Sequence, residues 1–208
     1  LHINEFRGFE KFCEGRLLNE MPQITPRICG ICPISHHLAA AKATDAVLGL
    51  TPPPTAQLLR ELMHHGQIIQ SHAMHFFELA GPDLILGFDA DPAIRNVVGL
   101  AQADADLTLK AINIRKFGQE VIATLGGRRI HPTFAVPGGV NKTLEESERD
   151  TILSQIEDMK ATAQLGIAIM KGWAEKHKED IERFAVFPTG YFGLVTPNNG
   201  LELFHGNI

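Results

Sequence analysis

The chain has 208 residues, of which 44% are hydrophobic and 21% charged, a balance typical of a globular protein with a buried core. Its 19 Lys and Arg against 24 Asp and Glu give a net charge of −5, which argues against nucleic-acid binding because such proteins present a basic face. No apolar run approaches the roughly 18 residues that span a bilayer, and no signal-peptide pattern opens the chain. We therefore expect a cytoplasmic protein without a membrane span.

The spacing of apolar residues, with the Gly and Pro positions between them, predicts a mainly α-helical fold with long helices and short β segments. Because the chain begins at Leu1 without an initiator Met, we interpret residues 1–208 as part of one domain, incomplete at both ends. Helices are predicted near 5–12 and over 37–43, 55–79, 91–126 and 143–181, and extended segments over 127–141 and 184–195. The predicted starts of the last two helices are Asp91 with Pro92, and Thr143 with Glu146.

Two of the predicted helices carry residues at alternating steps of four and three, the spacing of a buried face. In the helix over 55–79 this row includes His65 and His72. These are either hydrogen-bonded core histidines, the commoner case, or part of the surroundings of a metal centre. The row over 55–79 is Leu58, Leu62, His65, Ile69, His72, Phe76 and Leu79, and the row over 143–181 is Ile152, Ile156, Met159, Ala163, Gly166, Met170 and Trp173.

The cysteines indicate a metal or redox site. Their odd number argues against a disulfide framework, and Cys13 stands apart from the pair Cys29 and Cys32. Two thiols three residues apart turn their sulfurs to one side of a tight loop, which suits a shared soft metal. Arg27 is expected to favour the thiolate form, and His36, at the start of the next helix, can reach back to a cysteine sulfur.

Four interpretations of the cysteine pair remain open on spacing alone. A thioredoxin-like redox pair would follow a strand in a βαβ unit, which the helical surroundings do not offer. A structural zinc site would need four ligands, whereas Cys29, Cys32 and His36 make three. An iron–sulfur cluster normally needs four cysteines, and the fourth interpretation is a buried pair near a turn without a metal. A metal role is favoured, with the metal unidentified.

The segment R-I-C-G-I-C-P-I-S-H at 27–36 resembles the N-terminal motif R-x-C-G-x-C-x-x-x-H of the large subunit of nickel–iron ([NiFe]) hydrogenases. Three further blocks resemble that family in the same order: F-R-G-F-E at 6–10, S-H-A-M-H-F-F at 71–77, and G-G-R-R-I-H-P at 126–132 followed by P-G-G-V at 137–140. The residues within and around these blocks are most similar to those of the soluble NAD-reducing, or bidirectional, group. The resemblance implies the long-helix bundle of that large subunit.

The resemblance also implies roles for individual residues. Cys29 would be a terminal nickel ligand, and Cys32 would bridge nickel to an iron that carries carbon monoxide and cyanide. His36 would hydrogen-bond the sulfur of Cys32, and Glu10 would bind a nearby magnesium ion. The remaining residues, which would orient the loop or neighbour the metals, are Arg27, His72 and His131.

For the complete enzyme the resemblance implies heterolytic splitting of dihydrogen. Electrons would leave through an iron–sulfur small subunit to a diaphorase module that carries flavin mononucleotide and binds NAD, and maturation proteins would be further partners. The family's second cysteine pair, in D-P-C-x-x-C-x-x-H, has no counterpart here, and no G-x-G-x-x-G motif is present. We therefore expect a truncated large subunit that is inactive alone.

Other classes of protein remain as alternatives. A sibling enzyme that reduces a deazaflavin or sulfur would share these ligands, and so would a hydrogen sensor or an assembly-only relative. The quinone-module subunit of respiratory complex I shares the fold but lacks the metal cysteines that Cys29 and Cys32 match. A plain zinc-binding helical domain would be indicated by zinc without nickel.

Overall fold

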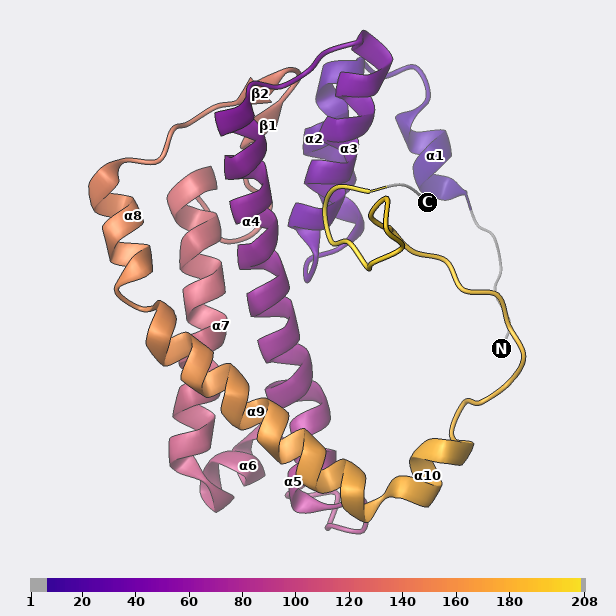
Figure 1. Ribbon diagram of the computed structural model, residues 1–208, viewed down its shortest axis with the longest axis vertical. Coiled ribbons are helices and arrows are strands. Elements are labelled where there is room, and N and C mark those ends of the chain that lie inside the picture. Colours follow the sequence, from indigo (N-terminus) through magenta and orange to yellow (C-terminus); the bar gives the residue numbers. More distant parts are fainter. Residues whose placement is uncertain (1–6, 207–208) are drawn as a thin grey trace. The chain divides into compact units, whose positions relative to one another are not determined.

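Helices build most of the fold, as the sequence predicts, and Figure 1 shows the computed structural model. The structure describes residues 7–206. The chain forms two units, Leu1–Met159 and Lys160–Ile208. The helix predicted near 5–12 is found as α1, Gly8–Cys13, while the first part of that prediction, at 5–6, lies outside the described residues.

Two long helices of the first unit, α4 (Pro54–Ala73) and α7 (Ala105–Gly126), lie side by side (Figure 1). α4 begins at a proline, which suits the first turn of a helix because the N–H there needs no intrahelical partner. α7 begins after Asp104, whose Oδ1 accepts a hydrogen bond from the N–H of Leu107 at 2.9 Å, and it ends at Gly127, with a φ of 76°. The packed row of α7 is Leu107, Ala111, Ile114, Gly118, Val121 and Leu125.

The buried face of α4 is one residue out of step with the predicted row. Leu58 is 66% exposed, and His65 and His72 are exposed too, so the prediction that these histidines occupy core positions is wrong. The backbones of α4 and α7 approach so closely that a Cβ on Gly118 would lie 2.6 Å from the carbonyl oxygen of Gly66. The two glycines thus help decide which face of α4 is buried. That face consists of Ala56, Leu59, Met63, Gly66, Gln70, Ala73 and, in the segment that follows, Phe77.

A third helix and a short hairpin pack near the start of α4. The helix is α3 (Pro33–Leu48), and the hairpin consists of β1 (Ala135–Val136) and β2 (Gly139–Val140), which pair antiparallel. Pro137 and Gly138 form the turn between the strands, and Gly138 has a φ of 75°. Proline followed by a residue with positive φ is the signature of a type II turn. The hairpin lies within the segment predicted to be extended.

The helix predicted over 91–126 is wrong at its start, because residues 91–96 are not helical, and it is interrupted at Asp104. Asp91 Oδ1 accepts a hydrogen bond from the N–H of Ala93 at 2.9 Å, as a cap would, but only a turn follows. A new helix, α6 (Val97–Ala103), begins after Asn96, whose side chain accepts from the N–H two residues later at 2.9 Å. The side chains of Asp91, Asn96 and Asp104 each accept hydrogen bonds from N–H groups two or three residues later. One predicted helix is therefore divided into a turn, α6 and α7.

The helix predicted over 55–79 changes its hydrogen bonding before it ends. After α4 the chain continues as a π-helical segment, η3 (Met74–Ala80), and then as α5 (Gly81–Leu86). Single turns of π-helix inside a helix are frequent near functional sites. The short elements that precede α3 are η1 (Leu18–Glu20), α2 (Met21–Ile24) and η2 (Thr25–Ile28).

The helix predicted over 143–181 is divided into three: α8 (Glu146–Leu153), α9 (Ile156–Lys176) and α10 (Lys178–Arg183). The predicted Thr143 cap is wrong by two residues, because the N–H of Glu145 instead donates to the Glu148 carboxylate at 3.0 Å. Of the predicted apolar row, Ile152, Ile156 and Met159 are half-buried, Gly166 is buried, and Ala163 and Met170 are exposed.

The tail of the second unit is mostly irregular. The sequence predicts short strands over 184–195, but no strand forms among residues 184–194 of the described chain. One bridge instead joins Val195 to Leu201 in antiparallel fashion.

Candidate metal centre

The loop that carries both cysteines lies between η2 and the first turn of α3. The hydroxyl of Thr25, in η2, lies 3.0 Å from the carbonyl oxygens of both Met21 and His36. This side chain ties the segment before the loop to the helix after it. Pro33 starts α3 immediately after Cys32, so both ends of the loop are anchored.

The ligand atoms of Cys29, Cys32 and His36 lie within 4.8 Å of one another, and within residues 7–206 no other group of three or more such ligands is found. Tetrahedral donors about 2.3 Å from a metal lie roughly 3.8 Å apart, so small side-chain movements would close this group around one ion. Two sulfurs and an imidazole suit nickel, iron, copper or zinc rather than magnesium or calcium. The three side chains therefore fit one part of a transition-metal site.

The two cysteines differ in their affinity for protons. The Cys32 thiol, and then the backbone N–H groups of Cys32 and Ile31, hold the pKa of Cys29 below its usual value because all of them stabilise the Cys29 thiolate. The N–H of Cys32 lies 3.3 Å from the Cys29 Sγ. Burial, and then the neighbouring Cys29, raise the pKa of Cys32 to about 11. The shift at Cys29 thus originates within the loop rather than in the charge of Arg27, to which the sequence pattern attributes it.

Two glutamines of α4 hold the middle of the loop, and the motif does not single them out. Nε2 of Gln67 and Nε2 of Gln70 donate to the carbonyl oxygen of Ile31, at 3.0 and 2.9 Å. Both side chains are buried. Their signal in the sequence is the spacing of three residues, on a helix whose other buried positions are mostly apolar.

His37 is a second residue that the motif does not single out. Its Nδ1 lies 2.5 Å from the carbonyl oxygen of Pro22, so Nδ1 carries the proton and Nε2 accepts from the N–H of Ala135 at 2.8 Å. The side chain is fully buried, and this burial lowers the pKa of His37 and keeps the ring neutral. His37 thereby joins the segment before the loop, α3 and the hairpin.

Arg27 and His131, both singled out from the sequence, lie close enough to interact. Burial, and then the positive charge of Arg27, lower the pKa of His131. His131 has a backbone φ of 50°, a conformation that residues other than glycine rarely adopt. Its Nδ1 is buried and has no hydrogen-bond partner in the described structure. A buried nitrogen of this kind is suited to hydrogen-bond a group that the described chain does not supply.

Two other residues singled out from the sequence are not part of the donor group. His72 is exposed, and its Nδ1 lies 3.0 Å from the carbonyl oxygen of Ile68, one turn earlier on α4. Glu10, on α1, is exposed, and its carboxylate forms an ion pair with Arg7 at 3.5 Å. The structure therefore brings the two cysteines and His36 together without either of these side chains.

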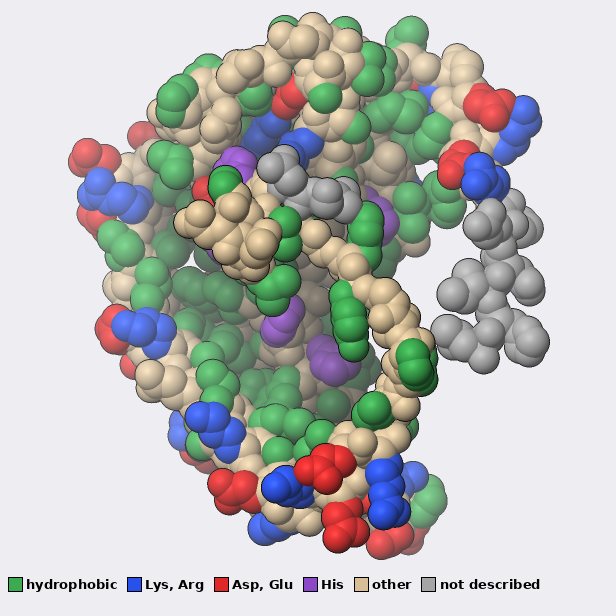
Figure 2. Space-filling view, turned by 45° about the vertical axis from the view of Figure 1, so that its right-hand side comes forward, with side chains coloured by type: hydrophobic (Ala, Val, Ile, Leu, Met, Phe, Trp, Pro, Cys, Tyr) green, Lys and Arg blue, Asp and Glu red, His purple; other side chains and the backbone are tan. Residues whose placement is uncertain are grey.

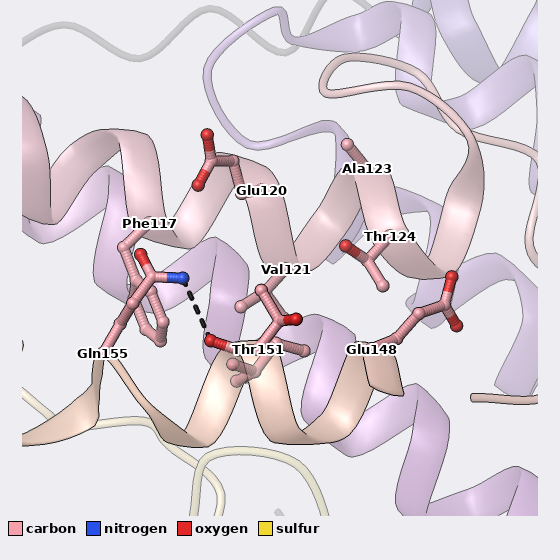
Figure 3. A pocket seen from close by; sticks show the side chains of 9 residues that line it. Phe117, Glu120, Val121, Ala123, Thr124, Glu148, Thr151 and Gln155 are labelled. Carbon is pink, nitrogen blue, oxygen red and sulfur yellow. Dashed lines mark hydrogen bonds between the residues drawn. The ribbon is translucent and has the colours of Figure 1, made fainter. Parts of the chain in front are cut away.

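A separate cavity of about 280 Å³ lies between α7 and α8 in the first unit (Figure 3). Its lining combines apolar side chains with carboxylates, hydroxyls and an amide, and none of these residues belongs to the sequence motifs. Gln155 already donates to the carbonyl oxygen of Thr151 at 3.1 Å there. The lining residues are Phe117, Glu120, Val121, Ala123, Thr124, Glu148, Thr151, Ile152 and Gln155.

The charged side chains are mixed in sign. On the face shown in Figure 2, Lys and Arg side chains lie beside Asp and Glu side chains, and no extended area of described residues carries positive charge alone. Among the described helices, none is both long and apolar enough to cross a membrane.

Comparison with known proteins gives a consistent result. Residues 7–105 match the family described as "Nickel-dependent hydrogenase". The chain is 49% identical over 195 residues to an F420-non-reducing hydrogenase vhu subunit of Methanocaldococcus jannaschii, covering 94% of this chain and 47% of that protein. It is 40% identical over 220 residues to the NAD-reducing hydrogenase HoxS subunit beta of Cupriavidus necator, covering 100% of this chain and 45% of that protein.

Solved structures show the same fold. An NAD+-reducing [NiFe]-hydrogenase in the H2-reduced state superimposes with a TM-score of 0.93 and 48% identity, over 99% of this chain and 46% of that one. A Ni-Fe-Se hydrogenase from D. vulgaris Hildenborough gives a TM-score of 0.72 and 26% identity, over 85% of this chain and 38% of that one. The chain thus has the large-subunit fold and spans about half the length of the relatives it matches.

Proposed function

Because the chain belongs to the nickel-dependent hydrogenase family, we propose that it supplies two thiolate ligands of a nickel–iron centre as part of a hydrogenase large subunit. The observation that carries this proposal is the group formed by Cys29, Cys32 and His36, whose ligand atoms lie within 4.8 Å of one another. The proposed reaction is the reversible oxidation of dihydrogen to protons and electrons.

The three side chains have different proposed tasks. Cys29 would bind nickel but not iron, and the N–H donors around its sulfur favour the thiolate form that binds a metal. Cys32 would be the thiolate shared by nickel and iron, and contact with a metal would lower the otherwise raised pKa of its thiol. His36 donates a hydrogen bond toward the Cys32 sulfur and so fixes its orientation. When bound, the nickel–iron centre, with carbon monoxide and cyanide on its iron, supplies the Lewis acidity that splits dihydrogen heterolytically.

The surrounding residues complete the proposal. Arg27 orients the loop, and His131 offers its buried Nδ1 to a group beside the centre. His72 neighbours the site in the complete protein. Glu10 binds magnesium, which requires that its carboxylate leave the exposed ion pair with Arg7.

Partner chains supply the rest of the electron path in this proposal. The electrons pass first to an iron–sulfur small subunit, a diaphorase module with flavin mononucleotide then passes them to NAD+, and maturation proteins insert the metals. The 48% identity to an NAD+-reducing enzyme of known structure supports this acceptor. The 49% identity to a protein of an F420-non-reducing hydrogenase favours a second candidate, a hydrogenase of that type that passes its electrons to an acceptor other than NAD+.

The metal assignment is tested by replacing one cysteine at a time in the complete protein with its partner subunits. Cys32→Ala should abolish nickel retention and hydrogen oxidation, because the bridging ligand is lost. Cys13→Ala is the matched control: Cys13 is also a free, partly buried cysteine, but it lies outside the donor group, so nickel content should be unchanged. Full nickel in Cys32→Ala, or zinc without nickel in the wild type, would overturn the assignment.

The electron acceptor is tested separately with the purified wild-type complex. Hydrogen-dependent reduction of both a viologen dye and NAD+ is the expected result. Reduction of the dye without reduction of NAD+ would retain the hydrogenase proposal and replace NAD+ by the second candidate. Absence of both activities from a nickel-loaded complex would favour a hydrogen sensor.

A further inference from the structure

One peptide unit links two hydrogen bonds on opposite sides of the cysteine loop. The carbonyl of Ile31 and the N–H of Cys32 belong to the same planar peptide, and in a trans peptide they point in opposite directions. On one side the carbonyl oxygen accepts from Gln67 and Gln70, at 3.0 and 2.9 Å. On the other side the N–H donates to the sulfur of Cys29, at 3.3 Å. Fixing the carbonyl therefore fixes the direction of the N–H.

The glutamines can hold this peptide in only one way. Each must turn its NH2 group toward Ile31, because the amide oxygen would repel the carbonyl oxygen. Two donors also fill both lone pairs of that oxygen, so rotation of the peptide breaks both hydrogen bonds. Gln67 and Gln70 are only 2% and 6% exposed, and water therefore has little access to replace either amide.

A purely stabilising role explains Gln67 poorly. Its Oε1 is buried and has no hydrogen-bond partner in the described structure. A buried acceptor left unpaired weakens the fold about as much as one good hydrogen bond strengthens it, so the net gain in stability from this side chain is small. The orientation that this side chain imposes on the loop accounts for its unpaired oxygen better than a gain in stability does.

We propose that Gln67 and Gln70 are positioning residues that orient the Ile31–Cys32 peptide so that its N–H donates to the Cys29 sulfur. This inference rests on the proposed function insofar as Cys29 binds nickel. The partial positive charge of the N–H then stabilises additional negative charge on the thiolate and its metal, as hydrogen bonds to sulfur do at other metal–thiolate sites. The glutamines thereby raise the reduction potential of the centre without touching it.

The variants are Gln67→Leu, Gln70→Leu and the double variant, made in the complete protein with its partner subunits. Each single variant retains one amide on the Ile31 carbonyl, which keeps the loop anchored. The single variants can therefore be measured even if the double variant fails to fold. Gln57→Leu is the matched control: Gln57 lies on the same helix, and its Nε2 also donates to a backbone carbonyl, that of Pro52, at 3.1 Å.

In the nickel-loaded complexes the midpoint potential is measured by redox titration followed by electron paramagnetic resonance, with nickel content determined in parallel. We expect unchanged nickel in the single variants and a potential that becomes more negative in each of them, and most negative in the double variant if it folds. The potential of Gln57→Leu should equal that of the wild type. Wild-type potentials in both single variants would overturn the inference.

A readout on the metal-free protein separates failure of this inference from failure of the proposed function. With 15N-labelled cysteine in the metal-free complete large subunit, the backbone amide signals of Cys13 and Cys32 are followed by NMR. Exchange of the Cys32 amide hydrogen with solvent should accelerate about tenfold in the single variants, as expected for the loss of an ordinary hydrogen bond, while the Cys13 signal stays constant. Unchanged Cys32 exchange would overturn the inference, whereas a wild type without nickel would overturn the proposed function and leave this measurement to decide on the glutamines.

Discussion

Arg60 of α4 and Asp45 of α3 form an ion pair inside the protein, with Arg60 Nη1 2.6 Å from Asp45 Oδ2 and both side chains less than a tenth exposed. The same pair holds the hairpin. Asp45 Oδ1 accepts from the N–H of Gly138 at 2.7 Å, and Arg60 Nη2 donates to the carbonyl oxygens of Val136 and Gly139 at 2.8 and 2.9 Å. Because the remaining polar atoms of both groups are also hydrogen-bonded, the geometry meets the condition for a tolerated buried pair.

Breaking this pair from one side should strongly destabilise the first unit. In Asp45→Asn the guanidinium of Arg60 stays buried without a negative partner. In Arg60→Met the carboxylate of Asp45 stays buried without a positive partner. Each variant should lose about 3–5 kcal/mol of unfolding free energy. Denaturant-induced unfolding of the protein, followed by circular dichroism, measures the loss.

The double variant Asp45→Asn/Arg60→Met provides the internal check. Its loss should be smaller than the sum of the two single losses, because the two residues are in direct contact. Lys110→Met is the matched control, since Lys110 pairs with Asp106 at 2.5 Å on the exposed face of α7 and should change stability by less than about 1 kcal/mol. Strictly additive losses would contradict the coupling of the pair.

His37 should make stability depend on pH below neutrality. Its pKa in the folded protein is lowered from 6.5 by burial, so between these two values the unfolded chain binds more protons than the folded one. Unfolding free energy therefore rises with pH in this window. The contribution of His37 is fully present above about pH 6.5 and is lost as the pH falls below it. Denaturation midpoints measured from pH 7.5 to 5 should show this decrease.

Replacing the histidine tests the attribution. His37→Gln removes the titrating group, so the protein should be less stable at pH 7.5 but its midpoint should fall less steeply between pH 7 and 5. His65→Gln, at an exposed position beside Glu61, should keep the wild-type slope. An equally steep decrease in His37→Gln would show that another group is responsible.

The sequence predicts the cysteine group but not the side chains that support it. The motif itself identifies Cys29, Cys32 and His36, because soft donors at short spacing have few other uses. Gln67 and Gln70 escape detection because their role depends on a carbonyl 36 and 39 residues away, which no local pattern reveals. Long-range partners of this kind appear only once the helices are packed.

The helix predictions fail where tertiary contacts outweigh local pattern. The row of large apolar residues on α4 predicts one buried face, but the close approach of Gly66 to Gly118 selects the neighbouring face instead. Asp91 and Thr143 are residue types that commonly cap the N-terminus of a helix, yet the helices begin after Asn96 and Glu145. Cap composition alone does not determine which of several candidate side chains is used.

Gly118→Ala should test the contact between α4 and α7. A Cβ there would lie 2.6 Å from the Gly66 carbonyl oxygen and 2.7 Å from the backbone nitrogen of Gln70, so the helices would have to separate. We expect a loss of about 1–3 kcal/mol in unfolding free energy, measured by chemical denaturation. Gly172→Ala in α9, where a Cβ meets no atom within 4 Å, should instead stabilise by about 0.5–1 kcal/mol. Equal effects of both substitutions would show that the helices do not touch at Gly118.

His36→Ala should separate metal retention from turnover in the complete enzyme. The imidazole lies within 4.8 Å of both cysteine sulfurs, and we assign it a hydrogen bond to the Cys32 sulfur rather than a bond to the metal. Its removal should therefore leave nickel in the protein while slowing hydrogen oxidation about 10- to 100-fold, the usual effect of losing a residue that orients a metal ligand. His65→Ala, on the exposed face of α4, should leave both nickel content and activity unchanged. Nickel content and hydrogen-dependent dye reduction, measured on the same preparations, give the answer. Loss of nickel from His36→Ala to the level of Cys32→Ala would show that His36 is itself a ligand, and full activity would show that its hydrogen bond to the sulfur has no catalytic effect.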